Sequence, residues 1–126
     1  RARVLHREPP VRLVQSLGRM GRAALSQLKL VLDAYSDRDA AGAEAVWRND
    51  SEIDEIYNSL FRELLTYMME DPRTIGLCTH LLFVAKNLER IGDHATNIAE
   101  ILHYEITGVE LTEQRPKSDA LEPHAR

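Results

Sequence analysis

Cysteine and long apolar runs are the scarcest features of this chain of 126 residues. No stretch comes near the roughly 20 consecutive apolar residues that a membrane-spanning helix needs. The opening RARVLHREPP has no apolar segment of the signal-peptide type. Cys78 is the only cysteine, which excludes a disulfide within the chain. This fits the reducing cytoplasm, where we expect the protein to be located.

An excess of positive charge, glycine-rich loops and strand patterns are absent as well. Lys and Arg number 16 against 20 Asp and Glu, a formal net charge of −4, which argues against nucleic acid as a partner. No glycine-rich loop of the P-loop type occurs, so the residues give no sign of direct nucleotide or phosphate binding. A hydrophobic content of 44% and a charged content of 29% are typical of one globular domain with a core of its own.

Helical periodicity is what the sequence does contain, in three segments at about 11–35, 40–70 and 73–107. Apolar residues recur there at steps of three and four, the spacing of a buried helical stripe. Asp71 and Pro72 separate the second segment from the third, as a cap and a first helical position. The expected buried stripe of the third segment consists of Leu77, Leu81, Val84, Leu88, Ile91, Ala95, Ile98, Leu102 and Ile106.

These segments predict an all-α fold, an elongated antiparallel three-helix bundle over residues 10–108. At 1.5 Å per residue the two longer helices would each measure about 45–50 Å. Residues 1–9, which run into a pair of prolines, are expected to be a linker. Residues 109–126 are polar and contain proline, so we expect a tail that is largely disordered.

Acidic side chains recur at helical spacing in the third segment, in KNLERIGDHATNIAE. Glu89 and Asp93 lie four residues apart, and Asn97 and Glu100 follow near the same side of the helix. On a helical wheel this group lies roughly 120° from the apolar stripe, so we expect it on a flank outside the core. Two acids at this spacing repel each other mildly, and a cation, basic groups such as Lys86 or water would offset that repulsion.

The second segment repeats the pattern with Asp50 and Asp54, again four residues apart. If the second and third helices lie side by side, the two acid pairs can face each other and form an oxygen-rich site. Carboxylate and amide oxygens suit hard or borderline cations such as Mg²⁺, Mn²⁺ or iron. A solvated acidic surface is the alternative, and metal content separates the two interpretations.

His103 lies about 40° from Glu89 on the same wheel, and it is the histidine to consider beside the acids. With Glu100 it forms the chain's single Glu-x-x-His triplet, whereas a ferritin-like di-iron carboxylate protein needs two such motifs facing inward from a four-helix bundle. That class stays as an alternative, next to a metal-free helical adaptor with solvated acids. Cys78 is interpreted as a packing residue.

The segment LERIGDHATNIAE resembles the signature of the PhoU family, the phosphate-specific transport system accessory proteins. Its pattern is Glu89-x-x-x-Asp93, followed by Asn97-Ile-Ala-Glu100. The acid pair of the preceding segment is similar to the second acidic motif of that family. The likeness covers roughly residues 9–108 and preserves the order of acid pair, Asp-Pro break and E-R-x-G-D-x-x-x-N-I-A-E.

The resemblance implies a role, partners and cofactors. Members of the family act as negative regulators of phosphate uptake and of phosphate-starvation signalling, without an enzymatic activity. The implied partners are the phosphate sensor histidine kinase and the ATPase subunit of the phosphate ABC transporter, so membrane association is expected only through partners. The implied cofactors are divalent or ferric ions: iron, manganese, zinc or magnesium.

The family motif also implies which residues hold the metal. The matching acids, taken residue by residue, are Asp50, Asp54, Glu89 and Asp93. Asn97 and Glu100 match the continuation of the motif and, with the nearby His103, are further candidate ligands or supporting groups.

The chain departs from the family in holding a single copy of the bundle, where the family has two. The other copy would precede the Glu-Pro-Pro stretch, so the sequence is interpreted as the C-terminal domain. A single bundle could also pair with another copy of itself, and a homodimer is therefore a hypothesis.

Overall fold

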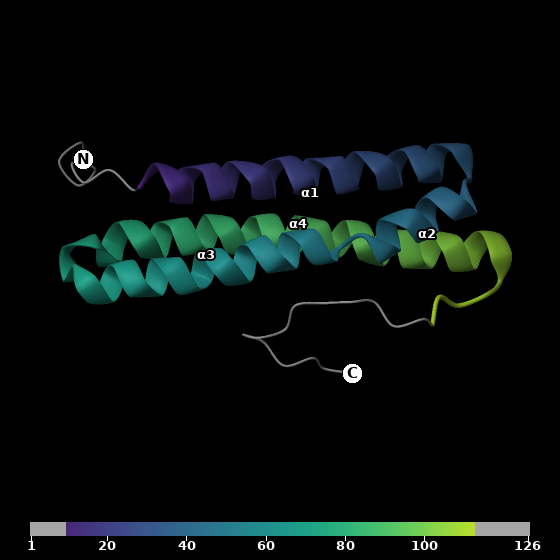
Figure 1. Cartoon of the computed structure of the whole chain (residues 1–126). Coiled ribbons are helices and arrows are strands. Elements are labelled where there is room, and N and C mark those ends of the chain that lie inside the picture. The colour runs from purple at the N-terminus through teal and green to yellow at the C-terminus, as the bar shows by residue number, and fades with distance from the viewer. Residues whose placement is uncertain (1–9, 113–126) are drawn as a thin grey trace.

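A computed structural model describes residues 10–112, and these residues form helices and no strand. The helices make three long rods: α1, then α2 and α3 end to end, then α4 (Figure 1). The all-α class is thereby confirmed, and the three-helix bundle is confirmed in outline. The elements are α1 (Val11–Asp37), α2 (Ala40–Arg48), α3 (Ser51–Glu70), the 3₁₀ helix η2 (Pro72–Thr74) and α4 (Ile75–Thr107).

The turn between α1 and α2 depends on a left-handed residue and a glycine. Arg38 has φ 50°, and the N–H of Asp39 donates to the carbonyl oxygen of Ala34 at 2.9 Å, which closes α1. The Asp39 carboxylate then caps α2 by accepting from the N–H of Gly42 at 3.0 Å. A Cβ at position 42 would lie 2.7 Å from Asp39 Oδ2, so glycine is the residue that leaves room for this cap.

The single helix expected over 40–70 is interrupted at Asn49 and Asp50. Asn49 has ψ 25°, and its N–H bonds to the carbonyl oxygen of Val46, three residues back instead of four. The sequence there is Asn-Asp-Ser, residue types whose side chains compete for backbone hydrogen bonds and favour caps over helix interiors. The prediction of one continuous helix was therefore wrong at this point.

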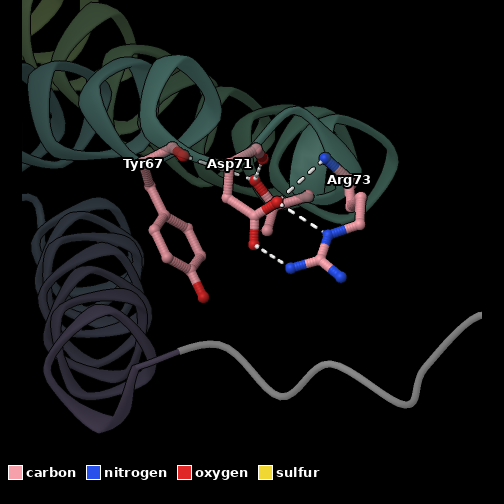
Figure 2. Close-up of polar contacts among 4 residues, drawn as sticks. Tyr67, Asp71 and Arg73 are labelled. Atoms are coloured by element: carbon pink, nitrogen blue, oxygen red, sulfur yellow. Dashed lines mark hydrogen bonds and ion pairs between the residues drawn. The ribbon is translucent and has the colours of Figure 1, made fainter.

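Asp71 closes the reversal between α3 and α4. Its N–H donates to the carbonyl oxygen of Tyr67 at 3.0 Å, and its carboxylate accepts from the backbone N–H and the Nε of Arg73 at 3.2 and 3.0 Å (Figure 2). The hydrogen bond to Asp71, followed by the attraction of its negative charge, raises the pKa of the Arg73 guanidinium. Pro72 occupies the start of η2, which confirms the predicted cap and break.

α4 turns a different face to the core than its large apolar residues predict. Val84, Ile91 and Ile98, from the middle of the expected stripe, each keep more than a third of their surface exposed. Small residues take their place, because α3 approaches closely: a Cβ on Gly92 would lie 2.7 Å from Ile53 Cδ1. The expected stripe was thus wrong at Val84, Ile91 and Ile98 and confirmed elsewhere, since Ala95 and Leu102 are buried and Leu81, Leu88 and Ile106 pack against the core. The buried residues of α4 are Cys78, Ala85, Glu89, Gly92, Ala95, Thr96, Ala99, Leu102 and His103.

The buried apolar residues form two clusters along the bundle. The first joins α1, α3 and the first half of α4, and it includes Met20 and Leu64. The second joins the end of α1, α2 and the second half of α4, and it includes Val31, Trp47 and Leu102. In the sequence of α3 and of α4, buried carboxylates occur where one cluster gives way to the other.

The chain after α4 folds back onto the bundle. His103 Nδ1 lies 3.1 Å from the carbonyl oxygen of Val109, and Leu111 packs against the second cluster. Val109 and Leu111, which the sequence analysis assigned to the tail, therefore contact the bundle. The linker expected over 1–9 and the rest of the tail, 113–126, lie outside the described residues.

Candidate acidic site

Three of the four acids expected on an exposed flank are buried. Asp50 and Asp54 are each 4% exposed and Glu89 is 8% exposed, while Asp93 is half-buried. Asp50 Oδ1 and Asp54 Oδ2 are closed off from solvent. The expectation of a flank outside the core was wrong for Glu89, because the rotation of α4 brings its side inward, and Asp50 and Asp54 of α3 are buried as well.

The two acid pairs belong to the contact between α3 and α4. Ile53, which lies between the two aspartates of α3, meets α4 at Gly92, next to the aspartate of that helix. One turn further along α3, the ring centroid of Tyr57 lies 5.2 Å from the Nζ of Lys86 on α4. Between these two contacts lie Asp54 on α3 and Glu89 on α4, whereas Asp50 and Asp93 lie just beyond the contact of Ile53 with Gly92. The pairs therefore lie along one helix–helix contact.

Lys86 supplies positive charge beside the buried carboxylate of α4. Its Nζ lies 2.9 Å from Glu89 Oε1, and the same ammonium group lies over the ring of Tyr57. A buried carboxylate is costly unless it is paired and hydrogen-bonded. The ammonium group of Lys86 therefore offsets part of the repulsion between the carboxylates.

The carboxylates of the acid pairs are chemically suited to a hard cation, but their arrangement is not that of a compact metal site. Paired carboxylates are typical ligands of magnesium, manganese and iron. Across residues 10–112, however, no three Asp, Glu, His or Cys side chains gather closely enough to hold a metal ion. A metal ion at Glu89 would have to displace Lys86 and draw the carboxylates of α3 and α4 together.

The further candidates lie apart from one another. Asn97 and Glu100 are exposed on α4, whereas His103 is 8% exposed and directs Nδ1 to the carbonyl oxygen of Val109. Glu100 and His103 thus do not form an inward-facing pair of the di-iron type. Of the other histidines, His94 is exposed on α4.

Gln27 is a buried polar residue that the sequence analysis missed. It is 6% exposed, and its Nε2 donates to the carbonyl oxygen of Val46 in α2 at 3.1 Å. Its signal in the sequence is a polar residue at a core position of α1, between Ala24 and Val31. This hydrogen bond ties α1 to the end of α2, just before the break that begins α3.

The fold and the acids define an all-α bundle protein whose distinguishing feature is a pair of acidic motifs along one helix–helix contact. A comparison with protein families identifies the particular family: the PhoU domain matches residues 17–102. The chain belongs to the PhoU family. The resemblance that the acidic motifs carry in the sequence is thereby confirmed.

Relatives with high identity carry the same name. A protein of Caulobacter vibrioides named phosphate-specific transport system accessory protein PhoU homolog is 65% identical over 114 residues, 90% of this chain and 50% of the relative. A protein of the same name from Rhizobium meliloti is 58% identical over 110 residues, 87% of this chain and 46% of the relative. The Escherichia coli phosphate-specific transport system accessory protein PhoU is 42% identical over 96 residues, 76% of this chain and 40% of the relative.

The chain spans about half the length of these relatives. No solved structure matches it. Among the helices of residues 10–112, none combines the length and the apolar character that crossing a membrane requires.

Proposed function

We propose that this chain is a regulatory accessory of phosphate transport, a negative regulator of phosphate uptake and of phosphate-starvation signalling. The observation that carries the proposal is membership of the PhoU family, with relatives up to 65% identical that are named as accessory proteins of phosphate-specific transport. The proposed role is that of an adaptor in the cytoplasm, not of an enzyme.

The proposed partners are the ATPase subunit of a phosphate ABC transporter and a phosphate sensor histidine kinase. An adaptor of this kind reaches the membrane only through its partners, and its net charge of −4 argues against nucleic acid. An elongated bundle offers long surfaces on several sides (Figure 1). Two partners could therefore bind it at different faces.

A cation at the acid pairs is part of the proposal. The proposed ligands are Asp50, Asp54, Glu89 and Asp93, with iron, manganese, zinc or magnesium as the ion. Support comes from the burial of three carboxylates, Asp50, Asp54 and Glu89, since a bound cation offsets the cost of bringing such charges together. On this proposal the metal ion holds α3 and α4 in register. Asn97, Glu100 and His103 are proposed only as supporting groups.

Complementation tests the regulatory role. A bacterium that lacks its own protein of this family is expected to express its phosphate-starvation genes even in phosphate-rich medium. Expression of this chain should lower the activity of a phosphate-starvation reporter by about tenfold. For a reporter that follows the occupancy of a binding site, this corresponds to about 1.4 kcal/mol of binding free energy. Full reporter activity with the protein present and folded in the cell would contradict the proposed function for this chain.

Metal analysis tests the cation separately. Protein without a tag, purified without chelator and equilibrated with Mn²⁺, Fe³⁺, Zn²⁺ or Mg²⁺, is compared with the Glu89→Gln, Asp93→Asn variant by mass spectrometry. Bound metal at stoichiometric level in the wild type and its loss in the variant would support the ligand set. The variant Glu52→Gln, Glu55→Gln, which changes two exposed acids of α3, is the control. If the wild-type protein binds no metal, the alternative interpretation as a metal-free helical adaptor is the one that remains.

A further inference from the structure

A buried polar residue of α1 occurs at the same boundary between the apolar clusters as the acids do. In the sequence, Gln27 falls between Ala24, a member of the first cluster, and Val31, a member of the second. Its side-chain amide donates to the backbone of α2, at the carbonyl oxygen of Val46. This carbonyl lies four residues before Asp50, so Gln27 can influence the acids through the chain that leads to them.

The Val46 carbonyl oxygen is the acceptor on which the break between α2 and α3 depends. In an uninterrupted helix it would accept from the N–H of Asp50, four residues further on. In the structure it accepts from the N–H of Asn49 at 3.2 Å and from Gln27 Nε2 at 3.1 Å. A carbonyl oxygen has two lone pairs, and these two donors occupy both. The side chain of Gln27 therefore favours the broken helix over the continuous one.

The local sequence permits the break without enforcing it. Asn49, Asp50 and Ser51 disfavour a helix interior only mildly, and the apolar spacing continues across them. Gln27 comes from another helix and is 6% exposed, so its hydrogen bond forms only in the folded bundle. A buried amide that loses its partner also carries a desolvation penalty. Packing of α1 thus fixes a break that the segment by itself leaves open.

The break places the start of a helix beside two buried acids. Asp50 is the N-cap residue of α3, and Asp54 belongs to its first turn. The first N–H groups of a helix have no partner within it and carry partial positive charge, which stabilises nearby carboxylates. A continuous helix would bond these N–H groups to carbonyl oxygens of the preceding turn. Both aspartates are 4% exposed, and uncompensated charge is costly there.

We propose that Gln27 is a positioning residue of the acidic site. Its side-chain amide holds the break between α2 and α3, and thereby keeps the N-terminus of α3 at Asp50 and Asp54. This role rests on the acidic site of the proposed function, but it requires no bound cation, because the helix start acts on the carboxylates of the metal-free protein as well.

Nuclear magnetic resonance of the metal-free chain tests the hydrogen bond and the break. Gln15, exposed on the same helix, is the matched control. In the wild type the side-chain amide protons of Gln27 should exchange with water at least about tenfold more slowly than those of Gln15. Gln27→Met, which removes the donor at similar length, should move the Cα chemical shifts of Asn49 and Asp50 toward helical values, whereas Gln15→Met should not. Equal exchange rates, or shifts that Gln27→Met leaves unchanged, would overturn the proposal.

A double-mutant cycle with Asp54→Asn separates positioning from packing. Urea unfolding with chelator present measures the unfolding equilibrium constant. Gln27→Met should raise this constant about tenfold in the wild-type background, but less than about threefold in the Asp54→Asn background, where no charge remains at that position for the helix start to stabilise. Equal increases in both backgrounds would show that Gln27 contributes packing alone, and would overturn the proposal. A wild type that binds no metal would contradict the proposed cation and leave these results unaffected.

Discussion

At the scale of single residues, the α3–α4 contact rests on a glycine and a lysine. Gly92 lets α3 approach until Ile53 occupies the space of a missing Cβ. Lys86 lies between an acid of its own helix and an aromatic ring of α3. Gly92 sets the distance between the helices, and Lys86 compensates the negative charge of Glu89 in their contact. Both roles can be measured separately.

Gly92→Ala is expected to destabilise the protein even though alanine favours helix. The gain in helix propensity is about 1 kcal/mol, but an added Cβ 2.7 Å from the buried Ile53 Cδ1 overpacks the contact, at a cost of about 1–3 kcal/mol. We expect a net loss of about 1 kcal/mol in urea unfolding. Ile53→Val removes the clashing methyl, so the double variant should recover at least about 1 kcal/mol relative to additivity. Additive losses would contradict the close contact.

Lys86→Met should lower the free energy of unfolding by about 1–2 kcal/mol at pH 7 with chelator present, because it leaves the buried Glu89 without its ammonium partner. Lys29→Met is the control, since its pair with Asp33 is exposed on both sides and is worth at most about 0.5 kcal/mol. Thermal unfolding of both variants measures the difference. Equal losses would mean that Lys86 contributes no more than a surface ion pair.

At the scale of elements, the cap of α2 holds the α1–α2 reversal in place. Asp39→Ala removes the acceptor for the Gly42 N–H and should cost about 1 kcal/mol. Asp37→Ala changes an exposed carboxylate two residues earlier, at the end of α1, and should change stability by less than about 0.5 kcal/mol. Chemical denaturation distinguishes the two. An unchanged midpoint for Asp39→Ala would show that the turn, and not the cap, sets the reversal.

The three long helical segments and the Asp71–Pro72 break could be predicted because they depend on local signals, periodicity and caps. The rotation of α4 could not, because this helix has apolar residues on two adjacent flanks. Transfer free energy favours burial of Val84, Ile91 and Ile98, but the distance to α3 admits the row of Ala85 and Gly92 instead. Which flank faces inward depends on the neighbouring helix, and a single sequence does not state it.

The acidic motifs of the candidate site could be located from spacing, whereas their burial could not. Glu89 lies roughly 120° from the expected stripe on a helical wheel, yet it is 8% exposed once α4 has turned. Asp50 lies at the interruption between α2 and α3. The sequence does not reveal this interruption, because the apolar periodicity continues across it. The two errors have different causes, since the burial of Glu89 depends on how closely α3 and α4 approach each other and the break at Asp50 depends on local capping.

At the scale of the whole molecule, the two long faces differ in chemistry. The α3–α4 contact carries buried acids, whereas α1 exposes large apolar residues such as Leu25 and Leu32. A cation is therefore proposed at the first, and an apolar contact is expected at the second. Because α4 packs against both α1 and α3, a shift of this helix at one face would be felt at the other.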